Sequence, residues 1–166
     1  MMETAKTVTD SIIIGRKSSL LAVTDDMPLF VVDNEYEDIF SFNCGNGFLY
    51  TDSKHGENPF SGIETVTEIE SANVLWACNY TGAIQDKADV GEILGMLRAG
   101  RLRYLERCTD SIATDCVVKD SGFTYSIVSS GSYALLSQTE TIIFQDTILY
   151  SRIANSRYKV DIPRAP

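Results

Sequence analysis

Short apolar runs separated by turn-forming residues fill most of the chain after residue 38. Runs of about four to eight residues that alternate with Gly, Asn, Asp and Ser clusters are typical of antiparallel strands. In the first such region, two pairs of runs each flank a turn, which predicts a four-stranded meander over about residues 38–84. Its runs lie at 39–42, 48–50, 63–69 and 74–80, and its turns lie at 43–47 and 71–73.

A similar series of runs and turns follows in the second half of the chain and predicts a second meander over about residues 114–158. Four matches between the halves keep the same order at an offset of 74 to 76 residues, which indicates an internal duplication. We expect the two units to superpose, with Glu64 over Glu140 and Trp76 over Tyr150. The matched segments are 47–50 with 122–125, 60–61 with 136–137, 64–66 with 140–142, and 75–76 with 149–150.

The segment between the two meanders predicts a helix over about residues 89–99. Asp89 can cap its start and Gly100 can end it. Gly91 and Gly95 disfavour the helix by about 1 kcal/mol each relative to alanine. The apolar positions at helical spacing are Val90, Ile93, Leu94 and Leu97.

These elements predict one α+β domain over residues 1–166, with two repeated antiparallel β meanders joined by one helix and packed into a single core. A lone meander with one apolar face is marginally stable. Two copies can bury those faces on each other or on the helix, so the duplication supplies a core.

The formal net charge of −9 is unevenly distributed. Residues 1–86 hold 14 Asp and Glu against 4 Lys and Arg, whereas residues 87–166 hold 9 against 10. The acidic stretch 25–38 disfavours direct binding to nucleic acid, and it forms either a solvated surface or a face for a basic protein partner. Four arginines beside the predicted helix complement either its dipole or an anion: Arg98, Arg101, Arg103 and Arg107.

The sequence predicts a cytoplasmic protein without a metal or another cofactor. It shows no signal-peptide pattern and no apolar run of membrane-spanning length. His55 is the only histidine, and no CxxC pair occurs, which argues against a zinc site. We expect the four cysteines to be free and mostly buried thiols: Cys44, Cys78, Cys108 and Cys116.

No motif of nucleophilic catalysis, phosphate binding or dinucleotide binding occurs in the chain. His55 lies in a polar turn, where an exposed loop histidine is the ordinary expectation. The repeated pair Glu64 and Glu140 is the sharpest candidate for acid/base chemistry, if the two carboxylates face each other. The alternative is that each glutamate supports the fold by accepting hydrogen bonds.

Aromatic and polar residues of the first meander, together with the repeated glutamates, are candidates for a ligand pocket. They serve equally well as core aromatics with satisfied hydroxyl groups. The candidate residues are Tyr50, Asp52, Glu64, Trp76, Asn79, Tyr80 and Glu140.

Motifs in the first meander carry a resemblance to a known family: Tyr50-Thr51-Asp52, Gly56, FSGIETV at 60–66 and LWACNYTG at 75–82. The region 38–155 resembles a bacterial domain family of unknown function that is often found C-terminal to a helix-turn-helix domain in Cro/repressor-type regulators. Gln138 departs from that pattern, which has a glycine there, and the second copy lacks the closing glycine. The resemblance implies a fold and no particular activity.

Three functions remain open from the sequence. The missing catalytic motifs favour a non-enzymatic binding or regulatory module, with a small-molecule pocket or a protein partner. The first alternative is a small enzyme that uses the paired carboxylates Glu64 and Glu140. The second is an acidic inhibitor that occupies a basic groove of its partner, an idea that rests on the charge asymmetry alone.

Overall fold

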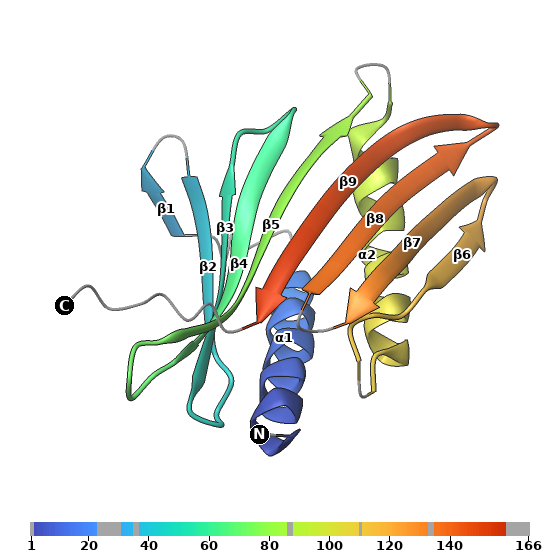
Figure 1. Cartoon of the computed structure of the whole chain (residues 1–166). Coiled ribbons are helices and arrows are strands. Elements are labelled where there is room, and N and C mark those ends of the chain that lie inside the picture. Colours follow the sequence, from blue (N-terminus) through green and yellow to red (C-terminus); the bar gives the residue numbers. More distant parts are fainter. Residues whose placement is uncertain are drawn as a thin grey trace.

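In the described part of the chain, one antiparallel sheet carries two helices on the same face (Figure 1). The computed structural model describes residues 2–22, 31–34, 37–85, 88–109, 111–132 and 135–158, and within them the side chains from residue 6 onward except 22 and 31–37. The helices are α1 (Met2–Ala22) and α2 (Val90–Arg107). The strands are β1 (Val31–Asn34), β2 (Glu37–Asn43), β3 (Phe48–His55), β4 (Phe60–Glu68), β5 (Val74–Ile84), β6 (Cys116–Asp120), β7 (Phe123–Ser132), β8 (Leu135–Phe144) and β9 (Thr147–Tyr158).

The described strands follow the order β1-β2-β3-β4-β5-β9-β8-β7-β6, and every neighbouring pair is antiparallel. The α+β class with an antiparallel sheet is therefore confirmed. Each of the eight strands from β2 to β9 coincides with an apolar run that was predicted to form a strand. Left-handed backbone at Gln145 and Asp146, with φ of 47° and 64°, forms the tight turn predicted between β8 and β9.

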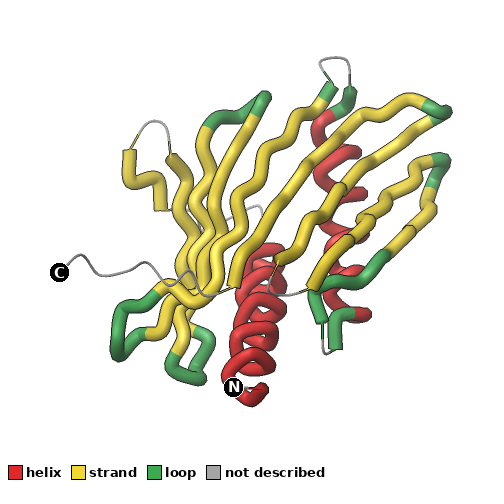
Figure 2. Tube along the Cα trace, viewed as in Figure 1, coloured by secondary structure: helices red, strands yellow, loops and turns green. Residues whose placement is uncertain are grey.

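The two halves of the sheet lie side by side and meet along β5 and β9. Nine residue pairs form this seam, from Trp76 with Tyr158 to Ile84 with Tyr150. The halves therefore do not stack face to face, which was one of the two arrangements left open by the sequence. Helices cover one face of the continuous sheet, as Figure 2 shows, and the buried apolar side chains of both halves form one core cluster.

Each helix packs on its own half of the sheet. Helix α1 contacts β2, β3 and β4, helix α2 contacts β6, β7 and β8, and the two helices touch each other. Helix α1 was not predicted, because Ile12 and Val8 supply an apolar face that Ser11, also fully buried, interrupts. Neither described helix is long and apolar enough to cross a membrane.

Helix α2 begins where the sequence indicated and ends later than expected. The Asp89 carboxylate accepts a hydrogen bond from the Glu92 backbone N–H, which confirms the predicted cap. The predicted end at Gly100 is wrong, since the helix continues to Arg107. Gly100 serves packing instead: a Cβ atom there would lie 2.3 Å from Cγ of Tyr125, so the glycine lets α2 rest directly on that ring.

Alanine substitutions at two glycines of α2 are expected to have opposite effects. Gly95→Ala should raise the free energy of unfolding by up to about 1 kcal/mol, because alanine favours a helix and nothing lies within 4 Å of the added methyl group. Gly100→Ala should lower it by about 1–3 kcal/mol through overpacking against Tyr125. Urea unfolding of both variants measures the difference, and equal gains would contradict the close packing.

Candidate functional site

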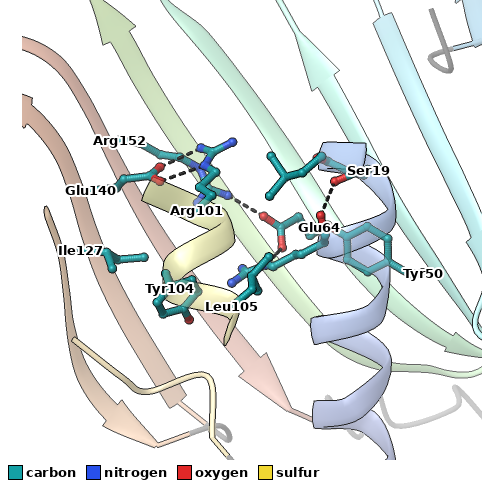
Figure 3. A pocket seen from close by; sticks show the side chains of 12 residues that line it. Ser19, Tyr50, Glu64, Arg101, Tyr104, Leu105, Ile127, Glu140 and Arg152 are labelled. Carbon is teal, nitrogen blue, oxygen red and sulfur yellow. Dashed lines mark hydrogen bonds and ion pairs between the residues drawn. The ribbon is translucent and has the colours of Figure 1, made fainter. Parts of the chain in front are cut away.

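A small polar cavity lies between the two helices and the centre of the sheet. Its volume is about 40 Å³, and both helices and five strands contribute to its wall. Figure 3 shows its side chains converging from the two helices and from the strands beneath them. The lining residues are Arg16, Ser19, Leu20, Tyr50, Asp52, Glu64, Arg101, Tyr104, Leu105, Ile127, Glu140 and Arg152.

Glu140 in β8 accepts hydrogen bonds from three side chains and is 1% exposed. Arg101 of α2 donates to both carboxylate oxygens, through Nε at 2.8 Å and Nη2 at 2.7 Å (Figure 3). The hydroxyls of Tyr125 and Tyr150 donate to the same carboxylate at 2.8 and 3.0 Å. Burial alone would raise the pKa of Glu140, but the charge and hydrogen bonds of Arg101 outweigh it and lower that pKa to about 2.

Glu64 in β4 is held between two buried arginines. Arg16 of α1 donates from Nε to one carboxylate oxygen at 2.7 Å, and Arg152 of β9 donates from Nη2 to the other at 2.6 Å. Burial opposes the ionised form, yet the two guanidinium charges lower the pKa of Glu64 below its ordinary value. Glu64 therefore stays a carboxylate at neutral pH and cannot serve as a proton donor.

Matching glycine–arginine pairs bring the two helices to the two glutamates. A Cβ atom on Gly15 would lie 2.2 Å from Cγ of Tyr50, just as one on Gly100 would meet Tyr125. Each glycine lets its helix approach the sheet closely enough for the next residue, Arg16 or Arg101, to reach a glutamate on the strand beside that tyrosine.

Among the described side chains, Asp52 in β3 is the one acid of the cavity that accepts no hydrogen bond from an arginine. Its partner is the Tyr80 hydroxyl, which donates at 2.7 Å. Burial, followed by the negative charge of Glu64, raises the pKa of Asp52 to about 6. The hydrogen bond from Tyr80 and the charges of Arg152 and Arg101 act in the opposite direction. Asp52 is thus the cavity carboxyl that changes its charge near neutral pH.

The raised pKa of Asp52 predicts a stability profile that depends on pH. An unfolded aspartate titrates near 3.9, so the stability that Asp52 contributes is fully present below that pH and is lost as pH rises through about 6. Asp52→Asn should therefore gain stability relative to the wild type across this window and keep the gain above it. Urea unfolding between pH 4 and 8 tests this, with Glu57→Gln, an exposed substitution, as control. Parallel wild-type and Asp52→Asn curves would contradict it.

The candidate residues named from sequence fall into three groups. Tyr50, Asp52, Glu64 and Glu140 line the cavity. Tyr80 lies under the Arg152 guanidinium, whose Cζ is 4.2 Å from the ring centroid, and Trp76 lies under that of Arg16 at 5.7 Å. Asn79 is exposed between the buried Cys78 and Tyr80, and strand alternation places it on the opposite face of the sheet, away from the cavity.

Sequence reasoning missed the three arginines as site residues. Arg101 was assigned to a cluster of four arginines that complements either the helix dipole or an anion, without a link to Glu140, and Arg16 and Arg152 were not singled out. One signal was available: the Gly-Arg dipeptide occurs at 15–16 and at 100–101. An apolar residue lies three positions before each glycine: Ile12 before Gly15, and Leu97 before Gly100.

Other candidate chemistry lies elsewhere. All four cysteines are free, three of them buried and Cys44 half-buried, as expected. His55 is exposed at the end of β3. No group of three or more potential metal ligands occurs within the part of the chain that the structure describes. The acidic stretch 25–38, the proposed partner surface, lies outside the described side chains except for Asp38.

Comparison with known families places the cavity within a recognised domain. The model described as "Domain of unknown function (DUF5680)" matches residues 52–156, a range that holds every charged lining residue except Arg16. Comparison with curated proteins and with solved structures finds no match for the chain. The family model covers more than half of the sequence, so the protein belongs to the DUF5680 family of domains of unknown function.

Proposed function

We propose that the protein is a non-enzymatic binding module whose ligand site is the polar cavity between α1 and α2. The observation that carries this proposal is the convergence of six charged side chains on one cavity: Arg16, Asp52, Glu64, Arg101, Glu140 and Arg152. Buried charges are costly unless they are paired. A cavity at that position leaves room for a ligand to complete the pairing.

The arrangement of Glu64 and Glu140 supports binding over acid/base catalysis. Both oxygens of each carboxylate accept hydrogen bonds from arginine, from Arg16 and Arg152 in Glu64 and from Arg101 in Glu140. The lowered pKa values of both groups keep them ionised at neutral pH. A glutamate that stays ionised and fully hydrogen-bonded is a poor proton donor and a weak base, so the paired-carboxylate enzyme is the less favoured alternative.

We infer that the two halves are copies of one helix-plus-meander unit, with α1 and α2 as equivalent helices. The Gly-Arg pairs and the tyrosine–glutamate pairs they contact support this. Gln138 replaces the glycine of the first copy, and the size of the residue paired with it changes in the opposite direction. Gly62 pairs with the large Tyr80 in one half, whereas Gln138 pairs with the small Ala154 in the other.

The family resemblance supports a regulatory setting for the module in the bacterial cytoplasm. A position beside a helix-turn-helix domain would suit a module that reports a ligand to that domain. Here, a ligand between α1 and α2 would change the contact between the two helices. That change could signal to a neighbouring domain that the site is occupied. The acidic inhibitor remains the alternative that rests on charge alone.

Ligand capture from cells tests the proposed function without assuming the ligand's charge. Protein purified under mild conditions would be denatured, and the released small molecules identified by mass spectrometry. We expect one compound at a stoichiometric level from the wild type and its loss from Ser19→Leu, which fills the cavity wall. The matched control is Ser18→Leu, one residue away on α1 and outside the lining. Turnover of a substrate that Glu64→Gln abolishes in a folded protein would overturn the binding-only function.

A further inference from the structure

A buried nitrogen of Arg16, in the cavity wall, has no hydrogen-bond partner among the residues that the structure describes. Arg16 uses Nε on Glu64 at 2.7 Å and Nη1 on the Gln138 side-chain oxygen at 3.5 Å. Its Nη2 is buried and makes no hydrogen bond to any described group, and Arg16 itself is 9% exposed. A buried charged donor without a hydrogen bond destabilises the protein. A ligand that supplies an acceptor to Nη2 would remove this penalty.

When Asp52 is protonated, the charges of the wall also favour an acceptor that carries negative charge. Three guanidinium groups, those of Arg16, Arg101 and Arg152, face the two permanent carboxylates Glu64 and Glu140. Asp52 is the third acid, and it is uncharged when protonated. With Asp52 protonated, the wall holds one more positive charge than negative, and an anion restores the balance.

The cavity restricts the size of the anion. The cavity volume is about 40 Å³. One buried water needs about 10–15 Å³ of such volume. The space therefore accommodates about three water-sized groups, which corresponds to a carboxylate and not to a whole phosphate. Arg101, whose side chain is 28% exposed, marks the side from which a ligand can enter.

We propose that the cavity binds the carboxylate end of a small organic acid, with Arg16 Nη2 as the donor that recognises it. This inference rests on the proposed function, because it names the ligand class of the same cavity. A planar carboxylate suits an arginine better than a lysine, since a guanidinium presents its donors in a fixed plane.

Binding should be coupled to a proton. An anion placed beside Asp52 disfavours the ionised form of that acid, so the protein should bind more tightly below pH 6 than above it. The charged and titratable groups that interact with Asp52 are Tyr50 on β3, Glu64 on β4, Cys78 and Tyr80 on β5, Arg152 on β9 and Arg101 on α2. Among them Asp52 alone has its pKa brought to about 6, and so Asp52→Asn should remove the pH dependence.

Calorimetric titration with small probes tests the proposal. The probes are sodium formate, sodium acetate, acetamide, methylammonium chloride and inorganic phosphate, at an ionic strength held constant with sodium chloride. Formate and acetate should bind one per protein, with acetamide, methylammonium and phosphate showing no binding. Arg16→Lys, which keeps the positive charge and removes Nη2, should weaken acetate binding at least about tenfold, the effect of one charge-assisted hydrogen bond. Ser19→Leu should abolish it, and Ser18→Leu should leave it unchanged.

The possible results separate the two proposals. If acetamide or methylammonium binds and Ser19→Leu blocks it, the cavity is a binding site but the anion inference is wrong. If acetate binds Ser19→Leu as well as the wild type, the acetate site lies elsewhere and the inference is also wrong. If no probe binds up to about 50 mM, the carboxylate inference is overturned, whereas the proposed function is then decided by the compound released from purified protein. A retained pH dependence in Asp52→Asn overturns the proton coupling.

Discussion

Glu64→Ala is expected to lower the free energy of unfolding by about 3–5 kcal/mol, the usual effect of removing one partner from a buried ion pair. Glu64 is 4% exposed, and the side chains of its partners Arg16 and Arg152 are 10% and 8% exposed. Without the carboxylate, two guanidinium groups would remain at the centre of the fold with like charges and little water. Neither helix α1 nor strand β9 could move its arginine into solvent without giving up packed contacts.

Chemical unfolding monitored by tryptophan fluorescence measures this loss. Glu106→Ala provides the matched control, because it removes an acid from the exposed Arg103 pair on α2, where the two side chains are 69% and 57% exposed. Exposed pairs contribute about 0–1 kcal/mol. Equal losses in the two variants would show that Glu64 is solvated and that the charge cluster is not buried in solution.

Trp76→Ala is expected to lower the free energy of unfolding by about 3–5 kcal/mol, the usual result of emptying a large core site. Trp76 is 1% exposed in β5, between Val66 on β4 and Tyr158 on β9. Its indole N–H has no hydrogen-bond partner among the described groups, so the loss is one of packing. The Arg16 guanidinium above the ring would lose its aromatic support as well.

Val74→Ala is the control for the tryptophan, because Val74 belongs to the same strand and is 48% exposed. We expect that variant to lie within about 0.5 kcal/mol of the wild type. Thermal unfolding followed by circular dichroism avoids dependence on tryptophan fluorescence, which the Trp76 variant lacks. A loss below about 1 kcal/mol for Trp76→Ala would mean that the ring is not part of the core in solution.

The strands were predictable because each has a local signal. A run such as 123–125 is apolar on alternate positions and directly follows turn residues at 121–122, and β-structure with one buried face favours that pattern. Helix α1 has no such clean signal. Its buried side includes Ser11 and Arg16 beside Ile12, so the periodicity of a helix that covers a charged cavity is partly polar.

The acids of the site were predictable and their partners were not. Glu64 and Glu140 stand out in the sequence because they recur at matching positions. Which cations they bind depends on contacts between distant segments: Arg16 lies on α1, Arg101 on α2 and Arg152 on β9. Composition and local spacing carry no information on such pairing. The Gly-Arg dipeptide was the available clue, and its meaning follows only from the tyrosine ring under each glycine.

The seam between β5 and β9 has a consequence for how the chain reaches its native state. Trp76 pairs with Tyr158, and Ile84 pairs with Tyr150, so the middle of the chain joins a strand near its far end. Contacts between segments so distant in sequence form late, because a long loop must close before they can be made. During synthesis β5 therefore remains an unpaired edge strand until β9 has left the ribosome. An exposed edge strand can pair with other chains. The growing polypeptide is most exposed to aggregation in that interval.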